Sequence, residues 1–188
     1  MKKVTEGLVQ IYTGHGKGKT TAALGTAFRA VGQGLRVCVI QFLKGGWKSG
    51  ERAAAARLAP ELEIRAFGAA QWGDRSKASA DRPWWELPPS EEDRSQAGEA
   101  MEFARGVITG GEWDIVVLDE VFGALARGLI SLDEVLGLIR TRPTEVELIL
   151  TGRDAPPEVI EAADLVTEMA EVKHPFQRGI NARKGIEY

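Results

Sequence analysis

A glycine-rich segment near the amino terminus carries the residues whose types and spacing best suit chemistry. Residues 13–21 read Thr-Gly-His-Gly-Lys-Gly-Lys-Thr-Thr; they follow the apolar run 8–12 and precede the small-residue run 22–28, which has the pattern of a helix. A strand, a glycine-rich turn and a helix in that order let backbone N–H groups converge on one anion. The segment, named here the phosphate loop, therefore predicts phosphate binding. The alternative is a flexible turn before an ordinary helix.

The phosphate loop departs from the spacing of a standard Walker A motif. Such a motif has a glycine, four further residues and then Gly-Lys-Ser/Thr. The run Gly18-Lys19-Thr20 supplies the end, but Thr13 stands where the first glycine belongs, and the other glycines are Gly14 and Gly16. Glycines at these positions still allow the backbone to wrap a phosphate without Cβ clashes. We expect Lys19 to pair with phosphate oxygens and the Thr20 hydroxyl to bind Mg²⁺.

A pair of carboxylates is predicted to complete this site. Residues 113–120, Trp-Asp-Ile-Val-Val-Leu-Asp-Glu, read as an apolar strand that delivers Asp119 and Glu120 at its carboxyl end, as in a Walker B motif. A hard cation that bridges phosphates prefers oxygen ligands and keeps several waters. One carboxylate can therefore hold Mg²⁺ while the other orients it. The alternative is an acidic pair that caps the next helix.

Three cationic side chains follow other predicted strands. Lys44 and Lys48 come after the strand 35–43, and Arg153 comes after the strand 145–150. In an open parallel sheet, ligands bind beyond the carboxyl ends of the strands, so all three are expected on the side of the phosphate loop. A guanidinium suits phosphate or carboxylate recognition. Solvated lysines and a surface salt bridge of Arg153 are the alternatives.

The elements that must position these residues alternate along the chain. Helices are expected at 22–31, 51–58, 90–109 and 131–140, and further strands at 62–67 and 163–169. Ser90 and Ser131 begin capping boxes, and Asp154 is expected to cap a helix opened by Pro156 and Pro157. The alternation predicts an α/β fold with a doubly wound, mostly parallel sheet of about six strands flanked by helices.

Composition narrows the class of protein. The 188 residues are 44% hydrophobic, which suits one domain, 1–188, with a full core. A net charge of −3 gives no electrostatic case for a nucleic-acid partner. The single cysteine, Cys38, lies in an apolar run, and two histidines give no support to a histidine metal site. No apolar run has the length of a signal peptide or of a membrane span, so we expect a cytoplasmic protein without a membrane partner.

The segment 68–89 has neither helical nor alternating periodicity. It holds Trp72, Trp84 and Trp85. Long structureless loops in compact domains are usually functional or disordered, and disordered segments are poor in aromatic residues. The segment therefore favours a loop that closes over a flat apolar ligand, and a loop that packs on a partner subunit is the alternative.

The chain resembles the ATP:corrinoid adenosyltransferases of the P-loop type, also called cob(I)yrinic acid a,c-diamide adenosyltransferases. The stretches that carry the resemblance are the phosphate loop with its helix start, 39–45, 116–120, 150–153 and much of the tail 172–188. The shortened glycine loop is typical of this family. The resemblance spans nearly the whole chain and implies a P-loop NTPase (RecA-like) fold.

The resemblance also implies a reaction. Family members transfer the 5′-deoxyadenosyl group of ATP to the Co(I) of a corrinoid and release triphosphate, in adenosylcobalamin biosynthesis or salvage. The implied catalytic residues are Lys19, Thr20 and Glu120, with Mg²⁺ held by Thr20 and Glu120 and supported by Asp119. The implied ATP-binding residues are Thr13, Gly14, His15, Gly16, Lys17, Gly18, Lys19, Thr20, Thr21 and Arg153. Trp72, Trp84 and Trp85 are assigned to the corrinoid as a group.

The same resemblance implies a homodimer and an electron donor such as a reduced flavoprotein. Two other functions fit the residues. A P-loop ATPase or phosphoryl-transfer enzyme would use the same lysine, threonine and carboxylates on a γ-phosphoryl group. A regulator that binds a nucleotide or corrinoid without turnover is the third hypothesis.

Overall fold

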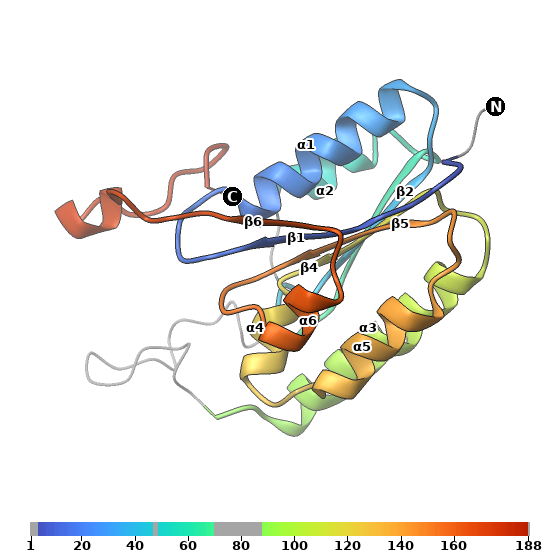
Figure 1. The fold of residues 1–188 in the computed structure, drawn as a ribbon. Coiled ribbons are helices and arrows are strands. Elements are labelled where there is room, and N and C mark those ends of the chain that lie inside the picture. The colour runs from blue at the N-terminus through green and yellow to red at the C-terminus, as the bar shows by residue number, and fades with distance from the viewer. Residues whose placement is uncertain (1–3, 47–48, 70–87, 188) are drawn as a thin grey trace.

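A six-stranded sheet forms the centre of the molecule, seen in a computed structural model that describes residues 4–46, 49–69 and 88–187 (Figure 1). The strand order is β3-β2-β4-β5-β1-β6, and every pairing is parallel. The strands are β1 (Val9–Thr13), β2 (Val37–Gln41), β3 (Leu62–Ala66), β4 (Ile115–Asp119), β5 (Glu147–Thr151) and β6 (Leu165–Glu168). The predicted α/β fold is confirmed.

Helices cover both faces of this sheet (Figure 1). They are α1 (Lys19–Gly32), α2 (Gly50–Ala55), α3 (Glu91–Thr109), α4 (Val121–Ala126), α5 (Leu132–Thr141) and α6 (Pro157–Glu161), followed by a 3₁₀ helix, η4 (Pro175–Arg178). Helices α1 and α2 lie on one face, and α3 and α5 lie on the other. The three strands β2, β4 and β5 are buried at all five positions, as expected of parallel strands covered on both sides.

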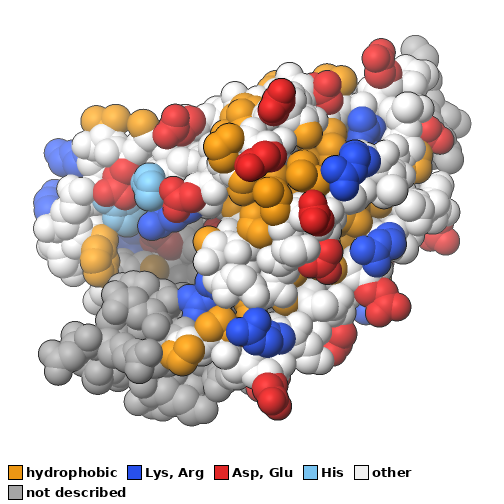
Figure 2. Space-filling model, turned by 60° about the horizontal axis from the view of Figure 1, so that its bottom comes forward, with side chains coloured by type: hydrophobic (Ala, Val, Ile, Leu, Met, Phe, Trp, Pro, Cys, Tyr) orange, Lys and Arg blue, Asp and Glu red, His pale blue; other side chains and the backbone are white. Residues whose placement is uncertain are grey.

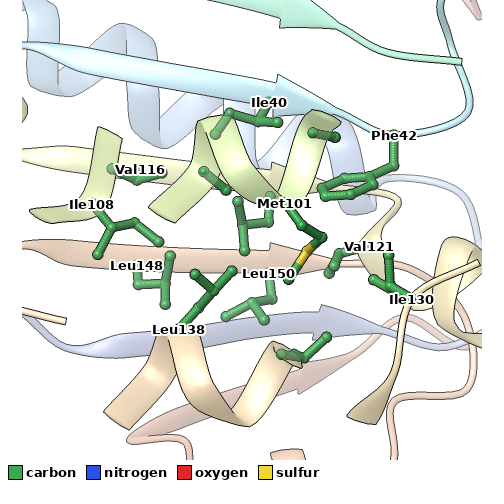
Figure 3. Packing of buried hydrophobic residues seen from close by; sticks show 14 of the residues in the cluster. Ile40, Phe42, Met101, Ile108, Val116, Val121, Ile130, Leu138, Leu148 and Leu150 are labelled. Atoms are coloured by element: carbon green, nitrogen blue, oxygen red, sulfur yellow. The ribbon is translucent and has the colours of Figure 1, made fainter. Parts of the chain in front are cut away.

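The larger hydrophobic cluster lies between the sheet and helices α3 and α5. Figure 3 shows Met101 of α3 and Leu138 of α5 packed near Leu148 and Leu150 of β5, all of them buried. A smaller cluster, which includes Ala23 and Ala27, fills the space under α1. These two layers fix the sheet rigidly from both sides, so the ends of its strands are well placed to hold reactive side chains.

The strand order decides which side chains can meet. Because all strands are parallel, their carboxyl ends lie along the same edge of the sheet. Strand β5 lies between β1, which leads into the phosphate loop, and β4, which leads to the two carboxylates. The end of β5 is therefore placed between the phosphate loop and the carboxylates.

The starts of the helices show where local sequence patterns were sufficient to predict the structure. Both predicted capping boxes are confirmed, because the Ser90 hydroxyl accepts from Asp93 N–H over 3.1 Å and the Ser131 hydroxyl accepts from Glu134 N–H over 3.2 Å. The prediction that Asp154 caps α6 is wrong. Asp154 adopts a left-handed conformation with φ of 55°, and the N-cap position of α6 falls two residues later, on Pro156.

The expected tryptophan-rich segment lies almost wholly outside the described residues, as do Trp72, Trp84, Trp85 and Lys48. Within residues 4–46, 49–69 and 88–187, no helix has both the length and the apolar character needed to cross a bilayer.

Candidate active site

The phosphate loop folds around the side chain of Lys19. This lysine is the first residue of α1 and is only 7% exposed. Its Nζ donates to the carbonyl oxygens of Gly14 over 2.7 Å and Gly16 over 2.8 Å. Burial lowers the pKa of Lys19 below its usual value, and the charge of Glu120 opposes that shift. The loop therefore holds an ammonium group at its centre.

Close packing explains why the loop has its unusual glycines. The N–H of Gly16 donates to the Met169 carbonyl over 2.7 Å, which ties the loop to the chain that follows β6. A Cβ on Gly14 would lie 2.6 Å from the Met169 oxygen, and one on Gly16 would lie 2.7 Å from the Ala170 oxygen. Any side chain at either position would therefore displace this segment.

Thr13 stands where a Walker A loop has its first glycine. Its side chain is buried, and its Oγ1 accepts a hydrogen bond from the N–H of Ala155 over 3.2 Å. Thr13 therefore fastens the start of the phosphate loop to the chain beyond β5.

The carboxylate of Asp119 gathers four donors at the end of β4. Its Oδ1 accepts from the hydroxyls of Thr20 and Thr151, each over 2.7 Å. Its Oδ2 accepts from Lys44 Nζ over 2.7 Å and from Gln41 Nε2 over 3.2 Å. These donors come from the start of α1, from the end of β2 and the residues after it, and from the end of β5. Asp119 therefore joins segments that are far apart in the sequence.

Charge holds Asp119 ionised although the residue is fully buried. Burial alone would raise its pKa, but the Lys44 ammonium and the hydrogen bonds from Thr151 and Thr20 hold the pKa of Asp119 below its usual value. Burial likewise favours neutral Lys44, yet the Asp119 carboxylate raises the pKa of Lys44 above its usual value. The two residues therefore form a stable ion pair at neutral pH.

Glu120 adopts a left-handed backbone conformation with φ of 61° at the turn between β4 and α4. Such a conformation is uncommon for a residue with a side chain. The Glu120 N–H donates to Thr151 Oγ1 over 3.0 Å, which holds this turn in place. Burial and the neighbouring Asp119 charge raise the pKa of Glu120. The adjacent carboxylates thus have opposite shifts and different surroundings.

A cavity of about 450 Å³ opens beside the phosphate loop. Eight of the ten predicted ATP-binding residues line it, namely His15, Gly16, Lys17, Gly18, Lys19, Thr20, Thr21 and Arg153. Glu120 and the tail residues Gly185, Ile186 and Glu187 line it as well. We name it the phosphate cavity.

A larger cavity of about 1030 Å³ adjoins the phosphate cavity. Its apolar lining comes from Phe42 and Leu43 after β2, Ala126 of α4 and Phe176 of η4, and Arg127 adds a cation. Figure 2 shows this end of the molecule hollowed, with basic, acidic and histidine side chains around the opening. Its volume lies at the upper end of the range of small-molecule sites, about 300–1000 Å³. We name it the apolar cavity.

The two cavities share a wall. The residues that line both are Lys44, Glu51, Glu120, Arg153, His174 and Glu187. A ligand in the phosphate cavity and a ligand in the apolar cavity would therefore meet at these side chains. This arrangement suits the transfer of a group from one ligand to the other.

The structure brings several of the predicted site residues together, and it adds two residues to which the sequence had given no role. Lys19, Thr20, Glu120 and Arg153 all line the phosphate cavity, whereas Asp119 lies behind them and lines neither cavity. Sequence reasoning missed Thr151 and Gln41. Each is a polar residue at the end of a buried strand, and this feature of the sequence could have identified them. Among the described residues, no group of three or more His, Cys, Asp and Glu side chains could hold a metal ion.

The sequence is similar to a known family of proteins over nearly its whole length. Residues 5–188 match the family model described as ATP:corrinoid adenosyltransferase BtuR/CobO/CobP. The chain is 38% identical to a corrinoid adenosyltransferase of Pseudomonas aeruginosa over 97% of its own length and 84% of the relative. It is 36% identical to the corrinoid adenosyltransferase of Escherichia coli K12 and to corrinoid adenosyltransferase CobA of Salmonella typhimurium, each over 97% of this chain and 86% of the relative.

The opposite pKa shifts of the two carboxylates predict opposite effects of neutralising them. Asp119 has a lowered pKa, so its ionised form stabilises the fold above the ordinary value of 3.8, and Asp119→Asn should lower Tm at pH 7. Glu120 has a raised pKa, so above that pKa its charge destabilises the fold, and Glu120→Gln should raise Tm at pH 7.

Thermal unfolding followed by circular dichroism from pH 3 to 8, without nucleotide or divalent cations, tests both signs. The gain from Glu120→Gln should vanish below the ordinary value of 4.5, where the carboxyl is protonated in both states. The deficit of Asp119→Asn should shrink as the pH falls below 3.8, through the folded-state pKa. Shifts of the same sign in both variants at pH 7 would contradict the assignment.

Proposed function

This chain belongs to the ATP:corrinoid adenosyltransferase family, and we propose that it transfers the 5′-deoxyadenosyl group of ATP to the Co(I) of a corrinoid, releasing triphosphate. The family resemblance expected from the sequence is confirmed, and with it a role in ATP-dependent adenosylation of corrinoids in cobalamin biosynthesis. The observation that carries the proposed reaction is the wall shared by the phosphate cavity and the apolar cavity.

The triphosphate of ATP occupies the phosphate cavity in this proposal. Lys19 exchanges the carbonyls of Gly14 and Gly16 for phosphate oxygens, and its position inside the loop supports this role. Backbone N–H groups at the start of α1 add favourable interactions with an anion. Arg153 also lines the phosphate cavity, and its guanidinium suits phosphate oxygens.

The residues around Thr20 fit Mg²⁺. The Thr20 hydroxyl donates a hydrogen bond to Asp119, so the lone pairs of its oxygen can face a cation. The Glu120 carboxylate lines the same cavity, and both groups are the oxygen ligands that Mg²⁺ prefers. Asp119 acts as the positioning residue for Thr20. When bound, Mg²⁺ would stabilise negative charge on the triphosphate.

The reaction needs no general base, because Co(I) itself is the nucleophile. The cobalt electron pair forms a bond to C5′ of the ribose, and the electron pair of the C5′–O bond leaves with the triphosphate. The leaving group carries about four negative charges, so the protein must stabilise charge that develops on it. Lys19 and Arg153 are placed to do so.

The corrinoid occupies the apolar cavity in this proposal. Leu43, Ala126 and Phe176 offer apolar contacts to a large flat ring. We also propose, from the sequence, that Trp72, Trp84 and Trp85 bind the corrinoid. A homodimer and a reduced flavoprotein as electron donor stay predictions that rest on the family resemblance, and a cytoplasmic location stays a prediction that rests on the sequence.

An anaerobic assay with ATP, Mg²⁺ and chemically reduced cobalamin tests the reaction. We expect the spectrum of a light-sensitive adenosylated product to appear with the wild-type chain. Lys19→Ala should reduce the rate by about 10²-fold or more, because it removes a charge that stabilises the leaving group. Arg140→Ala, an exposed cation on α5, is the matched control and should keep the wild-type rate. A wild-type rate in Lys19→Ala would refute the phosphate-site assignment.

The apolar cavity is tested by filling it. Ala126→Trp should raise KM for the corrinoid about tenfold or more, because the indole would occupy space that the ring needs, whereas the Kd of ATP should stay unchanged. Ala162→Trp places the same side chain on an exposed position that lines neither cavity, and should change neither constant. An unchanged corrinoid KM in Ala126→Trp would locate the corrinoid elsewhere.

A further inference from the structure

Lys44 has no role in the proposed reaction as described above, although it lies at the wall between the two cavities. It lines both cavities, whereas Lys17 and Lys19 line only the phosphate cavity. A group that starts on a ligand in one cavity and ends on a ligand in the other must pass the shared wall. The oxygen that leaves the transferred carbon must lie at the same wall. Among the lysines that the structure describes, Lys44 is the one that lines both cavities and so lies at the wall where the proposed reaction breaks this bond.

The backbone on both sides of Lys44 is firmly held. Leu43 has a left-handed conformation with φ of 61°, and the Lys44 N–H donates to the Phe67 carbonyl over 2.9 Å. A Cβ on Gly45 would lie 1.8 Å from the Gly68 oxygen, so the chain after β2 is pressed against the chain after β3. This part of the chain can therefore present the Lys44 side chain in one direction.

The ammonium group of Lys44 is fixed as well. Its Nζ lies 2.7 Å from Oδ2 of Asp119, and the Lys44 side chain is 27% exposed. One of its three N–H donors is used by Asp119, which leaves donors for a ligand in the cavities. Two other basic side chains of the shared wall have different surroundings, because Arg153 is exposed and the His174 ring accepts at Nδ1 from the Phe176 N–H over 3.2 Å.

We propose that Lys44 is a catalytic residue whose ammonium donates a hydrogen bond to the 5′ oxygen as it leaves the ribose. This inference rests on the proposed function. Cobalt goes formally from Co(I) to Co(III) as the Co–C5′ bond forms, and the electron pair of the C5′–O bond becomes charge on the terminal oxygen of triphosphate. Lys44 stabilises that charge and keeps its proton.

This role of Lys44 predicts that its ammonium group interacts more strongly with the product tripolyphosphate than with the substrate ATP. In ATP the 5′ oxygen is an uncharged ester oxygen, whereas in inorganic tripolyphosphate the corresponding oxygen carries charge. Hydrogen bonds to charged groups are stronger than those to neutral ones. Lys44 should therefore contribute more to the binding of tripolyphosphate than to the binding of ATP.

Isothermal titration calorimetry with Mg²⁺ and either ATP or inorganic tripolyphosphate tests this difference. Lys44→Met removes both the charge and the N–H donors, whereas Lys44→Gln removes the charge and keeps an N–H donor for Asp119. Loss of the ion pair alone would weaken both ligands alike, so the comparison of the two ligands within each variant isolates the proposed role. We expect each variant to raise the Kd of tripolyphosphate at least about tenfold more than the Kd of ATP. The matched control Lys17→Met removes a lysine from the phosphate cavity alone and should raise both constants by the same factor.

Equal weakening of ATP and tripolyphosphate in Lys44→Gln would overturn the proposal and reduce Lys44 to a partner of Asp119. Circular dichroism melting of each variant shows whether it is folded, and Lys44→Gln serves alone if Lys44→Met does not fold. The comparison uses no corrinoid. Its outcome is therefore independent of whether a cobalt–carbon bond forms, which the anaerobic assay tests.

Discussion

The buried carboxylate of Asp119 is the interaction on which the site depends. A buried charge is costly unless it is paired and hydrogen-bonded, and here Lys44, Gln41, Thr20 and Thr151 supply these bonds. Each donor lies on or just beyond an element that the hydrophobic layers hold in place. One ionised side chain thus sets the relative positions of the phosphate loop, the end of β5 and the chain after β2.

The backbone explains why two neighbouring carboxylates take different roles. Asp119 ends β4 and lies between its donors, so its pKa is low. One residue later, the left-handed turn at Glu120 places that carboxylate on the wall of both cavities. The first carboxylate is therefore suited to positioning side chains, and the second is suited to meeting a ligand or a cation.

Sequence patterns that span only a few residues were sufficient to predict much of the fold and of the candidate site. The glycines around Lys19, the acidic end of the strand at Asp119 and the capping boxes at Ser90 and Ser131 each depend on residues a few positions apart. The role of Thr151 depends on β5 lying between β1 and β4, which the order of elements along the chain does not determine. The ion pair of Lys44 with Asp119 could not be predicted for the same reason, because it also depends on which strands are neighbours. The prediction that Asp154 caps α6 was wrong because its left-handed backbone cannot be read from residue types.

The central claim is that the three phosphates leave ATP as one unit when the sugar carbon is transferred across the shared wall. The most direct measurement is ³¹P NMR of the products after a single turnover with ATP, Mg²⁺ and a Co(I) corrinoid under anaerobic conditions. We expect the resonances of inorganic tripolyphosphate in an amount equal to the adenosylated corrinoid. Resonances of ADP and orthophosphate in its place would contradict the claim and indicate phosphoryl transfer.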